Sequence, residues 1–115
     1  MLKQYETVFI LTPVLSENQI KEAVNSFKKI ITNNGGEILH EEDWGLKKLA
    51  YPIQKKTTGY YHLFEFKAEG SMIEKLELEY RRDERIIRYI TVLLDKYSIE
   101  YSERRRNKIA ESKTK

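Results

Sequence analysis

The amino-acid sequence predicts an α+β domain, because segments typical of strands and helices follow one another in the order β-α-β-β-α-β. Its 115 residues are the usual size of a single domain. Four segments are rich in β-branched and aromatic residues, and two others carry apolar residues at spacings of three and four. Short connections and right-handed crossovers then favour a ferredoxin-like split βαβ arrangement, in which a four-stranded antiparallel sheet carries two helices on one face.

The first strand and the first helix carry the clearest local signals. Tyr5–Leu11 places apolar side chains on both alternating faces, which is typical of a central strand. Ser16 is a favourable N-cap, and Gln19 three residues later completes a capping box. The Asn-Asn-Gly-Gly run at 33–36 is expected to end the helix, because both residue types tolerate a left-handed cap. The helix is expected to bury one apolar stripe: Ile20, Ala23, Val24, Phe27, Ile30 and Ile31.

A hairpin is expected to join strands over Glu37–Tyr51 and Gly59–Ala68 through a basic loop at residues 52–58. Gly45 interrupts the first of these strands and predicts a bulge. This long strand is expected to lie at an edge of the sheet. Simple alternation would place five of its residues on one face: Ile38, His40, Glu42, Trp44 and Leu46.

The second helix is expected to begin at Ser71, with Glu74 completing another capping box. Ile86–Tyr97 is nearly continuous in apolar residues and is predicted to be the last strand. We therefore expect one domain over residues 1–97 and a basic, flexible tail over 98–115. Because the strands carry apolar residues on both faces, part of the sheet is expected to form an uncovered apolar patch.

Composition limits the function classes. There is no cysteine, which excludes disulfides, a thiol nucleophile and cysteine-based metal sites. The N-terminal residues lack the pattern of a signal peptide, and no stretch approaches the roughly 20 apolar residues that span a membrane, so a cytoplasmic protein is expected. The net charge of +3 is weak evidence by itself. Clustered lysines and arginines beside an acidic second helix indicate an anionic partner on one side of the molecule.

Residues 42–53, Glu-Asp-Trp-Gly-Leu-Lys-Lys-Leu-Ala-Tyr-Pro-Ile, closely resemble the signature of the bacterial small-subunit ribosomal protein six family. Lys55, the pair at 59–60 and the spaced arginines Arg81 and Arg88 extend the resemblance, which covers about residues 1–97. The chain departs from the family where a basic pair often precedes the first-strand tyrosine, because Gln4 follows Lys3 here and one cation is missing.

The resemblance implies a structural role without catalysis or a cofactor. Proteins of this family bind small-subunit ribosomal RNA together with small-subunit ribosomal protein eighteen, and neither a membrane nor a small-molecule substrate is implied. Because cations gain affinity for RNA by releasing counterions, seven residues are expected to contact phosphates: Lys3, Lys47, Lys48, Lys55, Lys56, Arg81 and Arg88. Trp44 and Leu46, on the expected edge strand, are candidate anchors for the protein partner, although Trp44 could equally pack within the hairpin.

Other functions find less support. The segment 58–65 departs from an RNA-recognition motif at four positions, so the aromatic residues of this strand are interpreted as core or edge packing. A metal site at His40 and His62 is not expected, because neighbouring strand carboxylates such as Glu41 and Glu42 point to opposite faces. Two alternatives remain open on this fold: a small-molecule-sensing domain that dimerises through its sheet, and an acylphosphatase-like enzyme, for which no catalytic motif is found.

Overall fold

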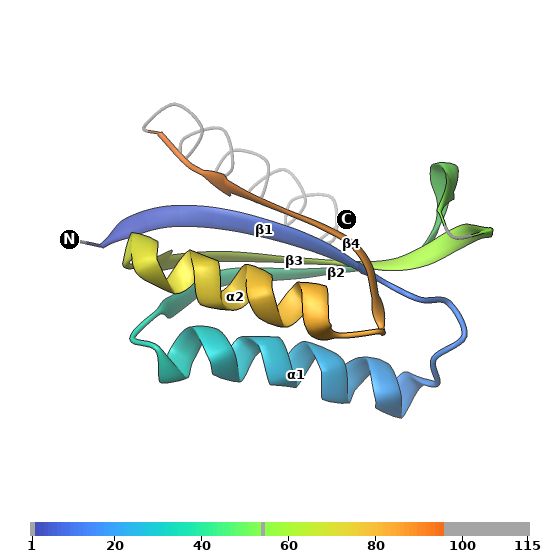
Figure 1. The fold of residues 1–115 in the computed structure, drawn as a ribbon, viewed down its shortest axis with the longest axis horizontal. Coiled ribbons are helices and arrows are strands. Elements are labelled where there is room, and N and C mark those ends of the chain that lie inside the picture. Colours follow the sequence, from blue (N-terminus) through green and yellow to red (C-terminus); the bar gives the residue numbers. More distant parts are fainter. Residues whose placement is uncertain (1, 54, 96–115) are drawn as a thin grey trace, which may run out of the picture.

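The computed structural model describes residues 2–53 and 55–95. It contains the predicted elements in the predicted order (Figure 1). Their bounds are β1 Lys3–Leu11, α1 Glu17–Asn33, β2 Glu37–Ile53, β3 Lys56–Ala68, α2 Gly70–Arg82 and β4 Ile86–Leu93. The predicted tail at 98–115 lies outside the described residues.

The strands form one antiparallel sheet in the order β2-β3-β1-β4. Both described helices lie on the same side of this sheet, and within residues 2–53 and 55–95 no helix covers the other side, called here the open side (Figure 1). This is the ferredoxin-like arrangement, so the predicted fold class is confirmed. The long strand β2 lies at one edge, as predicted, and β4 lies at the other.

Aromatic rings fill the core between the sheet and the helices. Phe9 of β1 is completely buried, and its ring lies 5.3 Å from Phe27 of α1, 5.6 Å from Phe64 and 5.4 Å from Tyr80, measured between centroids. The Tyr80 hydroxyl lies 3.2 Å from Thr7 Oγ1, and burial raises the pKa of this phenol. Phe66 is also buried here, so the interpretation of the β3 aromatics as core residues is confirmed for Phe64 and Phe66.

Both ends of α1 lie where the capping residues predicted them. The Ser16 hydroxyl accepts from the Gln19 amide at 3.3 Å, and the Ser16 amide donates to Gln19 Oε1 at 2.8 Å, which completes the capping box. The helix ends at Asn33, and Gly35 follows with φ of 83°. The left-handed conformation is the reason for the glycine at this position.

The alternation predicted for β2 is wrong for Ile38 and Leu46. The register between β2 and β3 shifts between Ile38 and His40 and again between Asp43 and Gly45. As a result, Ile38 lies opposite Phe66 and Leu46 opposite Tyr60, on the helix side of the sheet. His40, Glu42 and Trp44 lie on the open side. A bulge adds one residue to one strand and therefore reverses the faces that follow it.

The expected bulge at Gly45 is confirmed, with φ of 73°, but the hairpin is tighter than predicted. In place of a loop over residues 52–58, β2 continues to Ile53 and β3 begins at Lys56, and these two residues pair. Pro52 is tolerated because the pairing register is interrupted between Lys48 and Ile53.

The predicted start of α2 is also wrong. The helix begins at Gly70 with Glu69 as its N-cap, and no side chain caps it, so Ser71 and Glu74 form no capping box. Gly70, the first residue of the helix, lies next to the Tyr5 hydroxyl, and an added Cβ would make an ordinary contact with that oxygen at 3.5 Å. The last strand ends at Leu93 rather than Tyr97, and residues 96–97 lie outside the described part of the chain.

Candidate nucleic-acid and protein interface

The end of the β2–β3 hairpin, residues 46–53 and 55–58, forms an arm that turns toward the open side of the sheet (Figure 1). Leu49, in this arm, is only 6% exposed although it is not part of the core beneath the helices. Ile10 of β1 and Leu63 of β3 are likewise buried outside that core. The arm therefore helps to cover part of a second, smaller apolar cluster on the open face.

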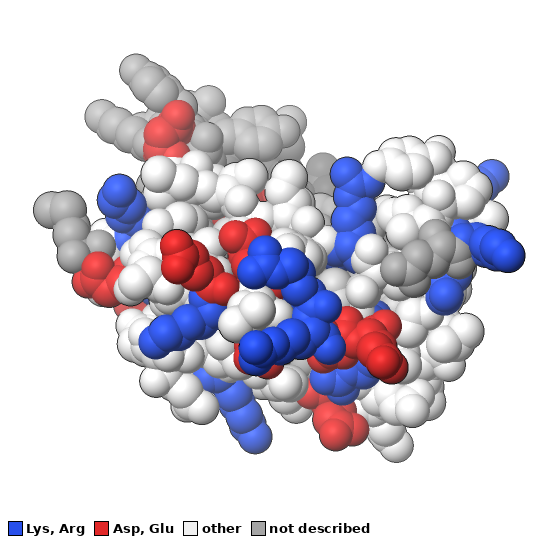
Figure 2. All heavy atoms as spheres, viewed as in Figure 1, with Lys and Arg blue, Asp and Glu red and all other residues white. Residues whose placement is uncertain are grey.

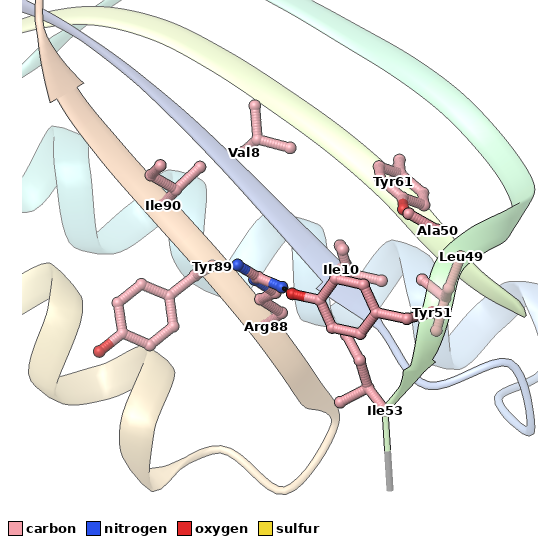
Figure 3. A pocket seen from close by; sticks show the side chains of 10 residues that line it. All are labelled: Val8, Ile10, Leu49, Ala50, Tyr51, Ile53, Tyr61, Arg88, Tyr89 and Ile90. Atoms are coloured by element: carbon pink, nitrogen blue, oxygen red, sulfur yellow. Dashed lines mark hydrogen bonds between the residues drawn. The ribbon is translucent and has the colours of Figure 1, made fainter. Parts of the chain in front are cut away.

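A hollow of about 290 Å³ lies between the arm and the open face. Figure 3 shows its walls, which come from β1, β3, β4 and the arm. Its lining includes Val8, Ile10, Leu49, Tyr51, Arg88 and Ile90. Ile90 at its rim is 59% exposed, and Val92, further along β4, is 42% exposed. This confirms the uncovered apolar patch that the two-faced strands predicted.

Arg88 and Tyr51 join the two walls of this hollow. Nη1 of Arg88, on β4, donates a hydrogen bond to the Tyr51 hydroxyl on the arm (Figure 3). The guanidinium carbon also lies 5.5 Å from the centroid of the Tyr51 ring, within cation–π range. Both side chains are exposed to solvent. Arg88 therefore contacts Tyr51 within the chain and also remains accessible to a ligand.

The structure brings six of the seven predicted phosphate contacts to one end of the molecule. Four lie in the arm: Lys47, Lys48, Lys55 and Lys56. Arg81 ends α2, and Arg88 lies opposite Ile10 near the end of β1. Lys3 is at the other end of β1, opposite Ala68. Seven residue steps along β1, at about 3.3 Å each, separate Lys3 from Ile10 and hence from that cluster by roughly 23 Å.

The two arginines at this end share a second hollow, between α2 and β4. Arg81 and Arg88 line it together with Tyr80 and Tyr89, and its volume is about 290 Å³. Arg85 is engaged elsewhere, because its Nη2 donates to Asp83 Oδ2 at 2.6 Å. Hydrogen bonds from this guanidinium lower the pKa of Asp83, which keeps the pair charged. Arg81 and Arg88 therefore differ from Arg85, whose charge is already paired with that of Asp83.

Charge is unevenly distributed over the face seen in Figure 2. Over the helices, acidic and basic side chains are mixed, whereas the arm carries basic side chains with few acidic ones beside it. An anion would therefore meet less repulsion at the arm than over the helices.

Trp44 is already well packed on the open face. Its ring stacks on Tyr61 at 6.1 Å, and its indole N–H donates to Glu42 Oε1 at 2.9 Å. The Lys47 ammonium lies 5.3 Å from the centre of the indole. Leu46, in contrast, is 53% exposed at the edge of the sheet. Of the two candidate anchors, Leu46 offers more free apolar surface to a partner.

The two histidines lie on opposite faces of the sheet. Nε2 of His62 lies 2.6 Å from Glu41 Oε2 on the helix side, and Lys28 pairs with the same carboxylate at 2.8 Å. His40 pairs with Glu42 on the open side at 3.0 Å. Within residues 2–53 and 55–95, no cluster of three or more histidine or acidic side chains could hold a metal ion.

Sequence reasoning did not single out Leu49 or Tyr51 as site residues. Both were assigned simply to the end of a strand, and their contacts across the open face arise only because the arm folds back. The one available signal was an apolar and an aromatic residue at the exposed end of a long edge strand.

The fold and this surface together define a small α+β domain that keeps one sheet face open and groups cations beside an apolar hollow. Residues 4–93 match the family described as Ribosomal protein S6. The chain is 66% identical over 106 residues to small ribosomal subunit protein bS6 of Phocaeicola vulgatus, covering 92% of this chain and 93% of that protein. It is 54% identical over 112 residues to the bS6 protein of Flavobacterium johnsoniae, covering 97% and 99% respectively.

A solved structure agrees with these sequence matches. The 30S ribosomal protein S6 of Thermotoga maritima superposes with a TM-score of 0.81 at 32% identity, covering 93% of this chain and 99% of that one. The chain belongs to the Ribosomal protein S6 family, and this confirms the resemblance found in the sequence. Members of this family are cytoplasmic structural proteins of the small ribosomal subunit, and the family is not one of enzymes. Among the described helices, none is long and apolar enough to cross a membrane.

Proposed function

We propose that this chain binds small-subunit ribosomal RNA through the cations of the arm and of the α2–β4 hollow, and binds small-subunit ribosomal protein eighteen on the open face. The observation that carries the proposal is the position of the two surfaces. An apolar hollow and six grouped cations meet at one end of the molecule, and Arg88 lines both hollows.

For the RNA contact, the support is electrostatic and geometric. Lysines and arginines that neutralise phosphates release bound counterions, and each contact steepens the dependence of affinity on salt by roughly 0.7 to 0.9 log units. Lys47, Lys48 and Lys55 are exposed on the arm, and Arg81 and Arg88 face one hollow. Lys3 is a separate contact at the far end of β1, on a different part of the RNA.

For the protein partner, the support is exposed apolar surface on β4, an edge strand whose outer side pairs with no other described strand. Ile90 and Val92 extend the hollow along β4, and Leu46 is exposed on β2. A partner segment that fills the hollow would cover Ile90 and Val92 and contact the arm. Leu46 lies on the helix side of the sheet and would meet the partner separately, at the edge of β2. Leu46 is the stronger of the two predicted anchors, while Trp44 acts mainly by supporting the arm through Tyr61.

The test is a binding titration at several salt concentrations. It uses a central-domain fragment of small-subunit ribosomal RNA, with and without purified small-subunit ribosomal protein eighteen. We expect tight binding that requires the partner and weakens as salt is raised. Absence of binding with a folded chain and an active partner would overturn the proposal, and a stable homodimer indifferent to RNA would favour the sensing-domain alternative.

Two double variants test which cations contact the RNA, by the change each makes in the salt dependence of binding. Replacing Arg81 and Arg88 with Ala should lower the salt slope by about one to two log units without unfolding the domain, because both side chains are exposed. A matched variant, Lys29→Ala with Lys75→Ala, also removes two exposed cations but from the helices. It should leave the slope close to that of the unmodified protein. Equal effects of the two double variants would show that only net charge matters.

A further inference from the structure

Beyond Lys48 the arm has little backbone pairing, so its position depends on the packing of the buried Leu49 and on side-chain contacts with β4. The ladder between β2 and β3 has two register shifts before Lys48, and pairing is then interrupted until Ile53 pairs with Lys56. Tyr51 lies within this interrupted stretch. Among the described residues, the bond from Arg88 to Tyr51 is the only hydrogen bond that joins the arm to β4. These two residues are 37 positions apart in the chain.

The contact has two components that act in the same direction. The hydrogen bond fixes the hydroxyl end of the Tyr51 side chain, and the positive charge of the guanidinium lies 5.5 Å from the centre of the ring. Tyr51 remains 54% exposed, so solvent weakens both components. A contact of this kind is strong enough to favour one arm position several-fold, yet weak enough to open readily.

We propose that Arg88 and Tyr51 form a latch that holds the arm over the open face and keeps the apolar hollow formed before the protein partner binds. This inference rests on the proposed function for the meaning of the hollow, but the latch itself is a property of the free chain. Arg88 is then a positioning residue for the protein partner, in addition to its proposed contact with phosphate.

The physical reason is preorganisation. Without the latch, the arm samples positions in which the hollow is open or lost, and the apparent affinity falls by the fraction of time that the hollow is formed. Leu49 and Ile53 sit on the same arm and line the hollow, so a displaced arm removes apolar surface from one entire wall. The partner would have to restore that wall from its own binding energy.

The experiment is a double-mutant cycle on partner affinity with Arg88→Ala, Tyr51→Ala and their combination. If the latch exists, each single variant should raise the partner Kd about fivefold, and the double variant should raise it no further, because the second change removes nothing that remains. Tyr51→Phe keeps the ring and loses the hydroxyl, so an intermediate effect of about twofold is expected. Arg82→Ala, which removes an exposed cation from the end of α2, should leave the partner Kd unchanged.

The same variants are measured free in solution by ¹⁵N relaxation of the arm amides between Lys47 and Ile53. The latch predicts the same increase in arm motion in both single variants and in the double variant, with β1 unchanged. Additive effects on Kd, or an arm equally ordered in all variants, would overturn the latch. If the unmodified protein fails to bind the partner while the relaxation result holds, the proposed function fails and the latch stands.

Discussion

Gly59 lies next to the last residue of β3 that pairs with β1, and replacing it tests how tightly Ile10, in the wall of the hollow, is packed. The residue is buried, and a Cβ added to it would overlap the Cγ2 methyl of Ile10. That Cβ would also lie 3.4 Å from Ile87 Cδ1 and from the Leu11 carbonyl oxygen. Ile10 cannot turn aside easily, because a β-branched side chain has few accessible rotamers. Gly59→Ala should therefore displace Ile10, which lines the hollow.

Two opposing effects determine how much Gly59→Ala changes the free energy of unfolding. Alanine restricts the unfolded chain more than glycine does, which would stabilise the folded state by roughly 0.4 to 1 kcal/mol. Inserting a methyl group into packed surroundings costs about 1 to 3 kcal/mol. The structure favours the second effect, because the overlap is with a stiff side chain rather than a flexible one. We expect a net destabilisation of about 1 to 2 kcal/mol, measured by urea denaturation followed by circular dichroism.

A matched control and a second variant make this reasoning refutable. Gly70→Ala places its Cβ 3.5 Å from the Tyr5 hydroxyl, an ordinary contact at the start of α2, so it should be neutral or slightly stabilising. In the background of Ile10→Ala, which removes the overlapped methyl group, Gly59→Ala should lose its cost. A Gly59→Ala protein as stable as the unmodified one, or an undiminished cost in the Ile10→Ala background, would show that the overlap is not the cause.

Three further expectations concern single contacts. Ser16→Ala should cost about 1 kcal/mol in denaturant unfolding, because it removes half of the capping box; no loss would mean that the first turn finds another partner. Tyr80→Phe should cost roughly 1 kcal/mol, since the buried hydroxyl then no longer meets Thr7, and a thermal shift assay reports it. Asp83→Asn tests pH dependence: Arg85 holds the folded-state pKa of Asp83 below its ordinary 3.8. The ion pair therefore stabilises the folded state above pH 3.8, and this stabilisation is lost as the pH falls through the lower pKa of the folded state. The difference in unfolding free energy between Asp83→Asn and the unmodified protein should close in acid. A difference that stays constant with pH would contradict the assignment.

Within the proposed site, the sequence identified residue types better than it identified their arrangement. The clustered cations are recognisable as phosphate ligands by charge alone, and the signature at residues 42–53 indicates the family. Nothing local, however, distinguishes Lys3, at the far end of β1, from the cations of the arm, or shows that Arg85 is occupied by Asp83. Those differences depend on which strands are neighbours and on where each helix ends.

The amino-acid sequence by itself determined the order of the elements, the fold class and the family. Capping boxes and apolar periodicity act over three or four residues, so the start of α1 at Ser16 and its end before Gly35 could be located without a structure. Only the tertiary structure decided which faces residues of β2 present, because bulges near Leu39 and Gly45 reverse the alternation to suit pairing with β3. It also decided that Leu49 is buried and that Tyr51 meets Arg88, since these contacts join segments distant in the chain and form only when the arm folds over the sheet.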